Sequence, residues 1–85
     1  MTESLLPRVQ NAFHDAFDVD AQFVSMNTAP EDIPGWDSVG HLTLATRLES
    51  AFDVSFDVDD LMEMENVREI VRIVDSKLKS RVNIA

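Results

Sequence analysis

The feature that most constrains the fold is a turn at residues 34–35 that is followed closely by the start of a helix. Pro34 and Gly35 form a pair that is typical of a turn. Asp37 stands where a helix N-cap is expected, because its carboxylate can accept the unpaired amide hydrogens of a first helical turn. Ser38 is therefore predicted to be the first residue of a helix, at the end where the helix dipole and free N–H groups favour a phosphate.

The helix that begins at Ser38 is predicted to reach about Phe52 and has two apolar stripes. At about 100° per residue, one stripe should face the core; it consists of Leu44, Ala45, Leu48, Ala51 and Phe52. The opposite side holds Val39, Leu42 and Thr46. Its apolar residues are either incidental, since single exposed hydrophobic residues are common, or a docking surface. Gly40 weakens a helix by roughly 1 kcal/mol relative to alanine, so either the helix tolerates this cost or the glycine clears room for an approaching group.

A first helix is predicted from Ser4 to Phe17. Its apolar residues recur at helical spacing on one face: Leu5, Leu6, Val9, Ala12, Phe13, Ala16 and Phe17. Pro7 is tolerated only in the first turn, which makes Ser4 the expected N-cap. Residues 18–36 then form a connection that is long for a compact domain. Its apolar residues should fold back over the helix ends; they are Phe23, Val24, Met26, Ile33 and Trp36.

The remainder of the chain is predicted to contain a short helix and a long one. Residues 53–57 end the preceding helix, and Phe56 and Val58 are expected to turn inward. Residues 59–64 should form the short helix, with Leu61, Met62 and Met64 packed inward. A capping box at residues 66–69 opens the last helix, whose buried stripe is expected to comprise Val67, Ile70, Val71, Val74 and Leu78. Residues 81–85 should fray.

These elements together predict an all-α fold. We expect one four-helix bundle domain spanning residues 1–85, with three longer helices, a short third helix and a long loop between the first two. Sixteen acidic against seven basic residues give a formal net charge of −9, which disfavours binding to nucleic acid or to an anionic membrane surface. The acidity suits partners with basic docking patches, or it only keeps a small protein in solution. The chain has no cysteine, no signal-like segment and no bilayer-spanning apolar run, and we expect a cytoplasmic monomer.

The motif around Ser38 resembles the attachment motif of the acyl carrier protein family. The resemblance rests on Asp37-Ser38-Val39, followed by an apolar helix that ends in the run Glu49–Val54, and it extends from about Ile33 to Leu78. It implies that a phosphopantetheinyl transferase attaches 4'-phosphopantetheine from coenzyme A to the Ser38 hydroxyl, with Asp37 close to the metal of the transferase. The thiol of the arm would then hold an acyl or aminoacyl group as a thioester. The resemblance thus implies a carrier and not an enzyme, because the cofactor holds the reactive atom.

Partner enzymes on this interpretation would load the arm and use its cargo in biosynthesis. The residues expected to contact them are Val39, Leu42, Thr46, Glu49, Asp60 and Glu63. Fatty-acid-synthesis carriers have a second helix rich in acids, whereas here only Glu49 is acidic between Val39 and Phe52. The run from Pro34 to His41 also resembles free-standing carriers of specialised pathways. We therefore expect a specialised pathway rather than bulk fatty-acid synthesis. The rival hypothesis is a small acidic helical interaction module whose serine is never modified.

Other chemical signals near Ser38 are weak. Trp36 stands where a hydrolase elbow has its first glycine, and no strand is predicted before it. His41 lies one turn after Ser38, but no third group is evident that would orient it as a general base, so a partly exposed helix residue is expected. The acidic run 53–59 lacks the glycine and the final glutamate of a calcium-binding loop, since Met64 occupies the twelfth position. We expect no catalytic residue and no metal site.

Overall fold

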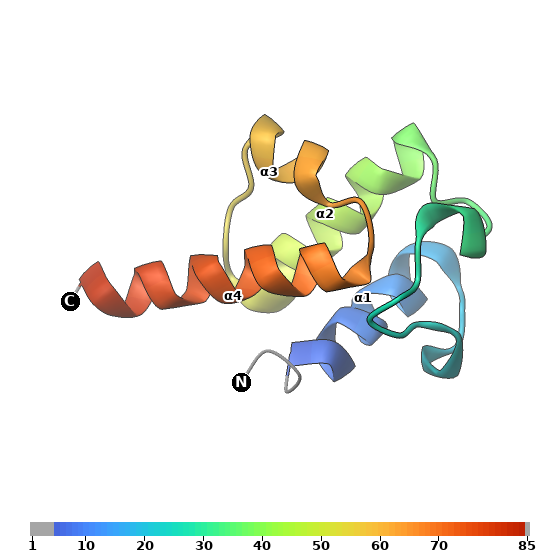
Figure 1. Ribbon diagram of the computed structural model, residues 1–85, viewed down its shortest axis with the longest axis horizontal. Helices are drawn as coiled ribbons and strands as arrows, with labels where there is room; N and C mark the ends of the chain where they lie inside the picture. The colour runs from blue at the N-terminus through green and yellow to red at the C-terminus, as the bar shows by residue number, and fades with distance from the viewer. Residues whose placement is uncertain (1–4, 85) are drawn as a thin grey trace.

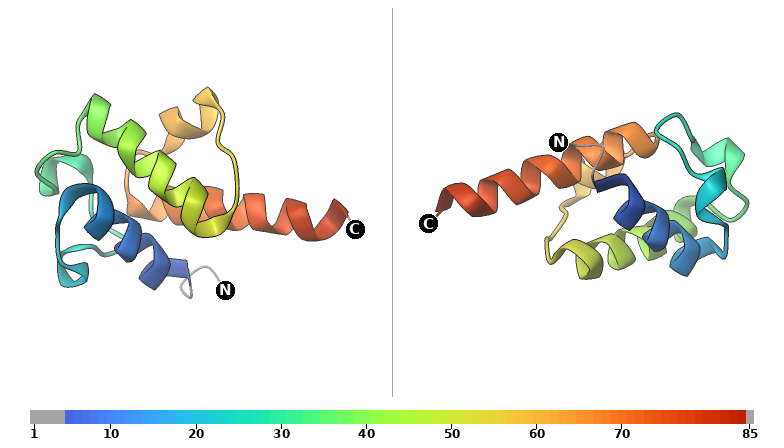
Figure 2. Two further views of the ribbon diagram at one scale, coloured as in Figure 1. Left: turned by 180° about the vertical axis from the view of Figure 1, so that it is seen from behind. Right: turned by 90° about the horizontal axis from the view of Figure 1, so that it is seen from below.

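The computed structural model describes residues 5–84, with side chains described as far as Ser80. The α-helices are α1 (Leu6–Phe17), α2 (Ser38–Phe52), α3 (Val58–Glu63) and α4 (Val67–Ile84), and the 3-10 helices are η2 (Ala21–Phe23) and η3 (Pro30–Asp32). Figure 1 shows α1, α2 and α4 packed around a shared interior, with the short α3 beside α2 and above α4. The C-terminal part of α4 extends beyond the other helices in every view (Figure 2). The predicted all-α fold with a short third helix is confirmed, and the described residues include no strand.

The core lies where α1, α2 and α4 meet. Its largest fully buried side chains include Phe13 from α1, Leu44 and Leu48 from α2, and Ile70 from α4. The stripes predicted for α1 and α4 are confirmed as buried or half-buried. Ile73, which the predicted stripe omits, is also buried at 4% exposure, so the covered face of α4 is wider than the sequence pattern indicates.

The stripe predicted for α2 is correct except at its C-terminal end. Ala45 and Phe52 are buried, but Ala51 is exposed. The last turn of α2 is covered on the Phe52 side, where the Arg8 guanidinium lies 4.3 Å from the centre of the Phe52 ring. Arg8 also donates a hydrogen bond to the carbonyl of Ala51, so Ala51 takes part in this contact through its backbone. The prediction that Ala51 faces the core is therefore wrong, because only the Phe52 side of the last turn is covered.

The long connection between α1 and α2 is held down by polar contacts as well as by burial. Val24, Ile33 and Trp36 are buried as predicted, whereas Phe23 is 64% exposed and corrects that prediction. Phe23 belongs to η2, a short surface turn with no buried residue. Its carbonyl accepts a hydrogen bond of 3.3 Å from the hydroxyl of Thr28, a buried polar residue, and this bond holds the backbone while the ring remains in solvent.

The same connection also completes the start of α4. The first amides of a helix have no partner within the helix, and here Val67 N–H donates to the carbonyl of Thr28 at 2.9 Å and Arg68 N–H donates to that of Met26 at 3.0 Å. Asn66 caps the helix as predicted, accepting from Glu69 N–H at 2.9 Å, although the Glu69 carboxylate pairs with Arg72 instead of returning to the cap. The backbone of α4 is helical as far as Ile84. The predicted fraying of residues 81–85 stays a prediction, since the side chains beyond Ser80 are not described.

Helix α3 begins one residue before the predicted start. Two residues that were predicted to pack inward are exposed to solvent instead. Asp57 and Asp60 cap its first turn reciprocally, with backbone amides donating to carboxylates at 2.9 and 3.0 Å. Val58 is 69% exposed and Met62 73% exposed, so both predictions of inward packing are wrong. The cap fixes Val58 as the first helical residue, and in so short a helix only one narrow side faces the bundle. Leu61 and Met64 occupy that side, as predicted.

At the N-terminus of α1, the cap position belongs to Leu5, which makes no side-chain capping bond, and Pro7 lies in the first turn as predicted. The N-cap predicted from the sequence, Ser4, lies outside the described residues. Among the helices that the structure describes, none combines the length and the apolar character needed to cross a bilayer.

Candidate functional site

The start of α2 presents a serine on a capped helix end. Asp37 is the N-cap, as predicted, and its carboxylate accepts a hydrogen bond of 2.9 Å from Gly40 N–H. The carbonyl of Asp37 accepts from His41 N–H at 2.7 Å. Ser38 is the first helical residue and is exposed, and none of the hydrogen bonds among the described residues involves its hydroxyl. The cap therefore fixes the backbone while it leaves the Ser38 oxygen open to a partner.

A close contact behind this helix start explains Gly40. Gly35 has a φ of 90°, a left-handed conformation that glycine adopts without strain, and it brings its carbonyl against α2. A Cβ atom on Gly40 would collide with that carbonyl oxygen and would lie 2.8 Å from Cε1 of Phe17. Of the two roles left open by the sequence, Gly40 thus makes room, and what it makes room for is the chain's own turn.

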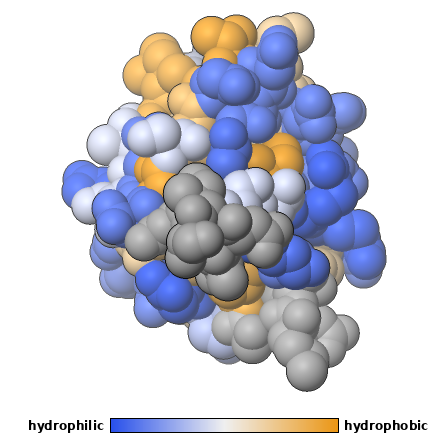
Figure 3. All heavy atoms as spheres, turned by 90° about the vertical axis from the view of Figure 1, so that its left-hand side faces the viewer, coloured by the Kyte–Doolittle hydropathy of each residue, from blue (hydrophilic) through white to orange (hydrophobic). Residues whose placement is uncertain are grey.

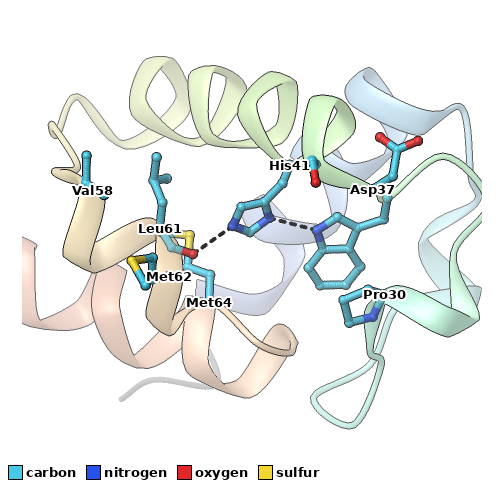
Figure 4. Close-up of a pocket in the computed structure, with 9 residues that line it drawn as sticks. Pro30, Asp37, His41, Val58, Leu61, Met62 and Met64 are labelled. Carbon is cyan, nitrogen blue, oxygen red and sulfur yellow. Dashed lines mark hydrogen bonds between the residues drawn. The ribbon is translucent and has the colours of Figure 1, made fainter.

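Trp36 and His41 form a hydrogen-bonded pair near Ser38, and a dashed line to the His41 ring marks this bond in Figure 4. Trp36 is 5% exposed, and its ring lies nearly perpendicular to that of Phe13, with 5.0 Å between ring centres. Its indole N–H donates to Nδ1 of His41 at 2.8 Å. Because an indole can only donate, Nδ1 must be the acceptor, and the proton of the neutral ring is on Nε2. That nitrogen lies 2.9 Å from the carbonyl oxygen of Leu61 in α3 and donates to it.

The two hydrogen bonds of His41 show that it is not placed to act as a general base for Ser38. Both ring nitrogens are engaged, one by Trp36 and the other by Leu61, so neither is available to take a proton from a serine. His41 is half-buried, close to the partial exposure that the sequence predicts. What sequence reasoning missed is its role as a link between the turn before α2, α2 itself and α3. No sequence signal pairs it with Leu61, because that bond is made through a backbone carbonyl twenty residues away.

A groove of about 450 Å³ opens beside Ser38, between the start of α2 and α3. Figure 4 shows most of its lining; the residues are Pro30, Trp36, Asp37, Ser38, His41, Val58, Leu61, Met62 and Met64. Most of these side chains are apolar. Met64 is buried at 2% exposure, whereas Val58 and Met62 stand in solvent at the rim. Viewed from the left of Figure 1, hydrophobic side chains gather at the top of the molecule, where α3 lies (Figure 3).

Some of the residues predicted to contact partners are exposed and free, whereas the acidic ones already have partners within the protein. Val39 is 74% exposed and Leu42 57% exposed on the outer side of α2, and Thr46 is exposed as well. Glu49, by contrast, is half-buried and accepts a hydrogen bond of 2.8 Å from Phe56 N–H, which holds the segment after α2. Glu63 pairs with Arg72 at 3.1 Å.

Asp60 is the most strongly paired of these acids. Its carboxylate lies 2.7 Å from Nζ of Lys77, and so ties α3 to α4. Burial by itself raises the pKa of Asp60, but hydrogen bonds from Lys77 and from Asp57 N–H, together with the lysine charge, outweigh burial and hold that pKa below its usual value. The hydrogen bond to Asp60 and the negative charge of its carboxylate raise the pKa of Lys77 in turn. A contact of Asp60 with a partner, which stays a prediction, would have to compete with this internal pair.

Residues 7–74 match the family model described as the phosphopantetheine attachment site. The match spans well over half of the chain and includes the whole of α2 with Ser38. The chain belongs to the phosphopantetheine-binding carrier family. Its fold is also similar to the solution structure of a holo acyl carrier protein from Geobacter metallireducens, with a TM-score of 0.77 and 29% sequence identity over 96% of this chain and 90% of that one. A search of curated proteins finds no match.

Membership of this family establishes the chain as a carrier that is not itself an enzyme and that bears 4'-phosphopantetheine covalently. The residues at the start of α2 fit such a group. An exposed serine hydroxyl can form a phosphodiester, and the amide end of a helix favours the negative charge that the phosphodiester brings. When attached, the group supplies a thiol for thioester chemistry. Carriers of this family are typically served by phosphopantetheinyl transferases and biosynthetic enzymes.

Proposed function

We propose that Ser38 is the attachment residue and that the chain carries acyl or aminoacyl groups as thioesters on its phosphopantetheine arm. The observation that supports this most directly is the combination found at Ser38: an exposed hydroxyl, free of internal hydrogen bonds, on the first residue of a long capped helix. Ser50 is also in α2 but lies in its C-terminal part, where the dipole disfavours an anion.

The attachment step requires little from the chain beyond position. The Ser38 oxygen forms a new bond to the phosphorus next to the pantetheine of coenzyme A, and the pyrophosphate bond breaks. Adenosine 3',5'-bisphosphate leaves, and the serine proton passes to a base that the transferase supplies. The Asp37 carboxylate, held by Gly40 N–H, keeps the first turn of α2 in place while the serine reacts. The protein thus provides position and recognition, and the transferase provides the chemistry.

We also propose that the partners are enzymes of a specialised pathway and that they approach over Val39, Leu42 and Thr46. These residues are exposed in about the first two and a half turns of α2, the end of the helix that presents Ser38. The one acid within α2, Glu49, is engaged by Phe56 N–H, which leaves the exposed side of this helix without a free carboxylate. Enzymes that recognise an acid-rich second helix would have no free carboxylate to bind on this side of α2. The lack of such carboxylates supports a pathway other than bulk fatty-acid synthesis.

Intact mass after co-expression with a broad-specificity phosphopantetheinyl transferase tests the attachment. The wild type should gain the mass of one arm, and Ser38→Ala should gain none. Ser50→Ala is the matched control, because it removes an exposed serine of the same helix and should load normally. Loading of Ser38→Ala would move the site to another serine. An unmodified wild type would favour the interaction module without a cofactor.

A further inference from the structure

The helix that presents Ser38 also carries an arginine without an internal partner. Side chains are described for six basic residues, and five of them contact other groups of the protein: Arg8, Arg68, Arg72, Lys77 and Lys79. The sixth is Arg47, which has no hydrogen bond, ion pair or ring contact with any residue that the structure describes. In a chain with sixteen acidic residues, a basic side chain left without a partner marks a position to explain.

The sequence of α2 accounts for the free state of Arg47. Side chains three and four residues apart are neighbours on a helix. The four positions at this spacing from Arg47 carry no carboxylate: Thr43, Leu44, Ser50 and Ala51. Arg47 is itself exposed, so its charge is available to a molecule that approaches α2.

Arg47 shares a face of α2 with the residues proposed to contact partners. Val39, Thr43 and Arg47 are spaced by four residues, and Leu42 and Thr46 form a second row beside them. The hydroxyls of the two threonines donate to the carbonyls of Val39 and Leu42 at 3.4 and 3.0 Å, so their hydrogens are not available to a partner. The face is therefore mainly apolar near Ser38 and ends in the charge of Arg47, about 13.5 Å along the helix axis from the serine.

The partner that must cover this face is the enzyme that modifies Ser38. Its catalytic groups have to reach the serine oxygen, and its surface then lies against the neighbouring turns of α2. Enzymes that act on the thiol stay at a distance set by the arm and need not touch these turns. A surface complementary to this face is apolar and has a carboxylate at the position of Arg47, because an arginine binds a carboxylate in a fixed geometry and such a pair fixes the register of a complex.

We propose that the phosphopantetheinyl transferase of this chain docks on the outer face of α2 through an apolar surface, with an Asp or Glu carboxylate of the transferase bound to Arg47. The inference rests on the proposed attachment at Ser38. Arg47 is a positioning residue, since it lies too far along the helix to touch the reacting atoms. A second copy of this chain is disfavoured as the occupant, because two chains with a net charge of −9 repel each other.

The kinetics of arm transfer test this contact. The protein without its arm is loaded from coenzyme A by the broad-specificity transferase, and loading is followed by intact mass at several carrier concentrations. Arg47→Glu should raise KM about tenfold and leave kcat within about twofold, because the lost contact is remote from the reacting atoms. Arg47→Lys keeps the charge but not the planar fork, and it should raise KM by no more than about threefold. High salt should reduce the difference between wild type and Arg47→Glu.

Lys79→Glu is the matched control, because it makes the same change in net charge on α4, at a side chain that is 69% exposed. Its KM should stay within about twofold of the wild type. Equal increases in KM for Lys79→Glu and Arg47→Glu would mean that only net charge matters and would overturn the proposal. A salt-independent effect of Arg47→Glu would also overturn it. Arg47→Glu should melt as the wild type does, since no described internal pair is lost; a lower midpoint would show that Arg47 stabilises the fold and is not free.

The direction of the effect distinguishes two kinds of docking surface. Asp15 and Asp18 of α1 border a hollow together with Val39 and Thr43, and a transferase with a basic surface would bind these carboxylates instead. Such a transferase would load Arg47→Glu faster than the wild type and Asp15→Asn more slowly. That result would overturn the proposal.

Two measurements on the wild type separate the remaining outcomes. Sedimentation should show a monomer, and a dimer that Arg47→Glu dissociates would assign the face to a second copy and overturn the proposal. A wild type that gains no arm would refute the attachment at Ser38. A wild type that is loaded, with an unchanged KM in Arg47→Glu, would refute this inference alone.

Discussion

Helices α2 and α3 form opposite walls of the groove beside Ser38, and they are held in place by different forces. Helix α2 buries Leu44, Leu48 and Phe52 at no more than 2% exposure. Helix α3 contains no fully buried residue; it is tied to its neighbours by the half-buried Leu61 side chain and by two polar contacts, Asp60 with Lys77 and the Leu61 carbonyl with His41. Hydrophobic burial is worth far more than an exposed ion pair, so the wall that presents Ser38 is the fixed one and the facing wall is the one that can be displaced.

The largest effect is expected from Leu48→Ala, which removes a fully buried side chain of the fixed wall. Truncation of a buried leucine costs about 2–5 kcal/mol through lost transfer energy and the cavity left behind. A domain of this size has only about 5 kcal/mol of stability to lose. Thermal unfolding followed by circular dichroism should show a much lower midpoint or no folded protein. A midpoint close to that of the wild type would mean that burial does not fix α2 in the way proposed.

Gly40→Ala should come next, with a loss of about 1–3 kcal/mol from overpacking. Helix propensity alone predicts the opposite sign, because alanine is favoured over glycine by roughly 1 kcal/mol. The added Cβ would collide with the Gly35 carbonyl and with Phe17, and we expect this collision to dominate. Thr43→Ala, at an exposed position of the same helix, is the control and should change stability by less than about 0.5 kcal/mol. A stabilised Gly40→Ala would show that the turn at Gly35 moves away freely.

A smaller and pH-dependent effect is expected from Asp60→Asn in the displaceable wall. The side chains of Asp60 and Lys77 are 20% and 32% exposed, and a pair of this kind contributes up to about 1 kcal/mol. The folded state lowers the pKa of Asp60 below 3.8, so its contribution is present above that value and is lost as the pH falls through the folded-state pKa. The midpoints of wild type and variant should differ at neutral pH and converge in acid.

Glu63→Gln provides the matched control for that experiment. It removes the pair between Glu63 and Arg72, whose side chains are 60% and 53% exposed, and its effect at neutral pH should be smaller than that of Asp60→Asn. If the two variants behave alike, the link between α3 and α4 does not depend on Asp60. The conclusion that an ion pair helps to hold α3 in place would then be wrong.

The same contrast explains which parts of the molecule could be predicted from sequence. The limits of α2 are those predicted, because a side-chain cap at Asp37 and a helical period are local signals. Long apolar stripes likewise placed the core. Val58 and Met62 were misplaced because a six-residue helix is too short for its period to define an inner face. The bond between His41 and the Leu61 carbonyl is a tertiary contact to the backbone. It could not be predicted, because the side-chain pattern of the sequence carries no information about which backbone carbonyl lies near a histidine.

A small effect on folding is expected from Leu42→Ala, which completes the comparison with Leu48→Ala in the same helix. Leu42 is 57% exposed, so truncation gives up little burial and should lower stability by well under the 2–5 kcal/mol expected for a buried leucine. Its deficit should appear in loading by the transferase or in turnover by partner enzymes, because an apolar anchor at an interface can contribute more than about 1 kcal/mol of binding. A melt and a modification time course on both variants measure the two effects separately. Should Leu42→Ala be as unstable as Leu48→Ala and yet load at the normal rate, the outer side of α2 is not the docking surface and partners approach the serine from another direction.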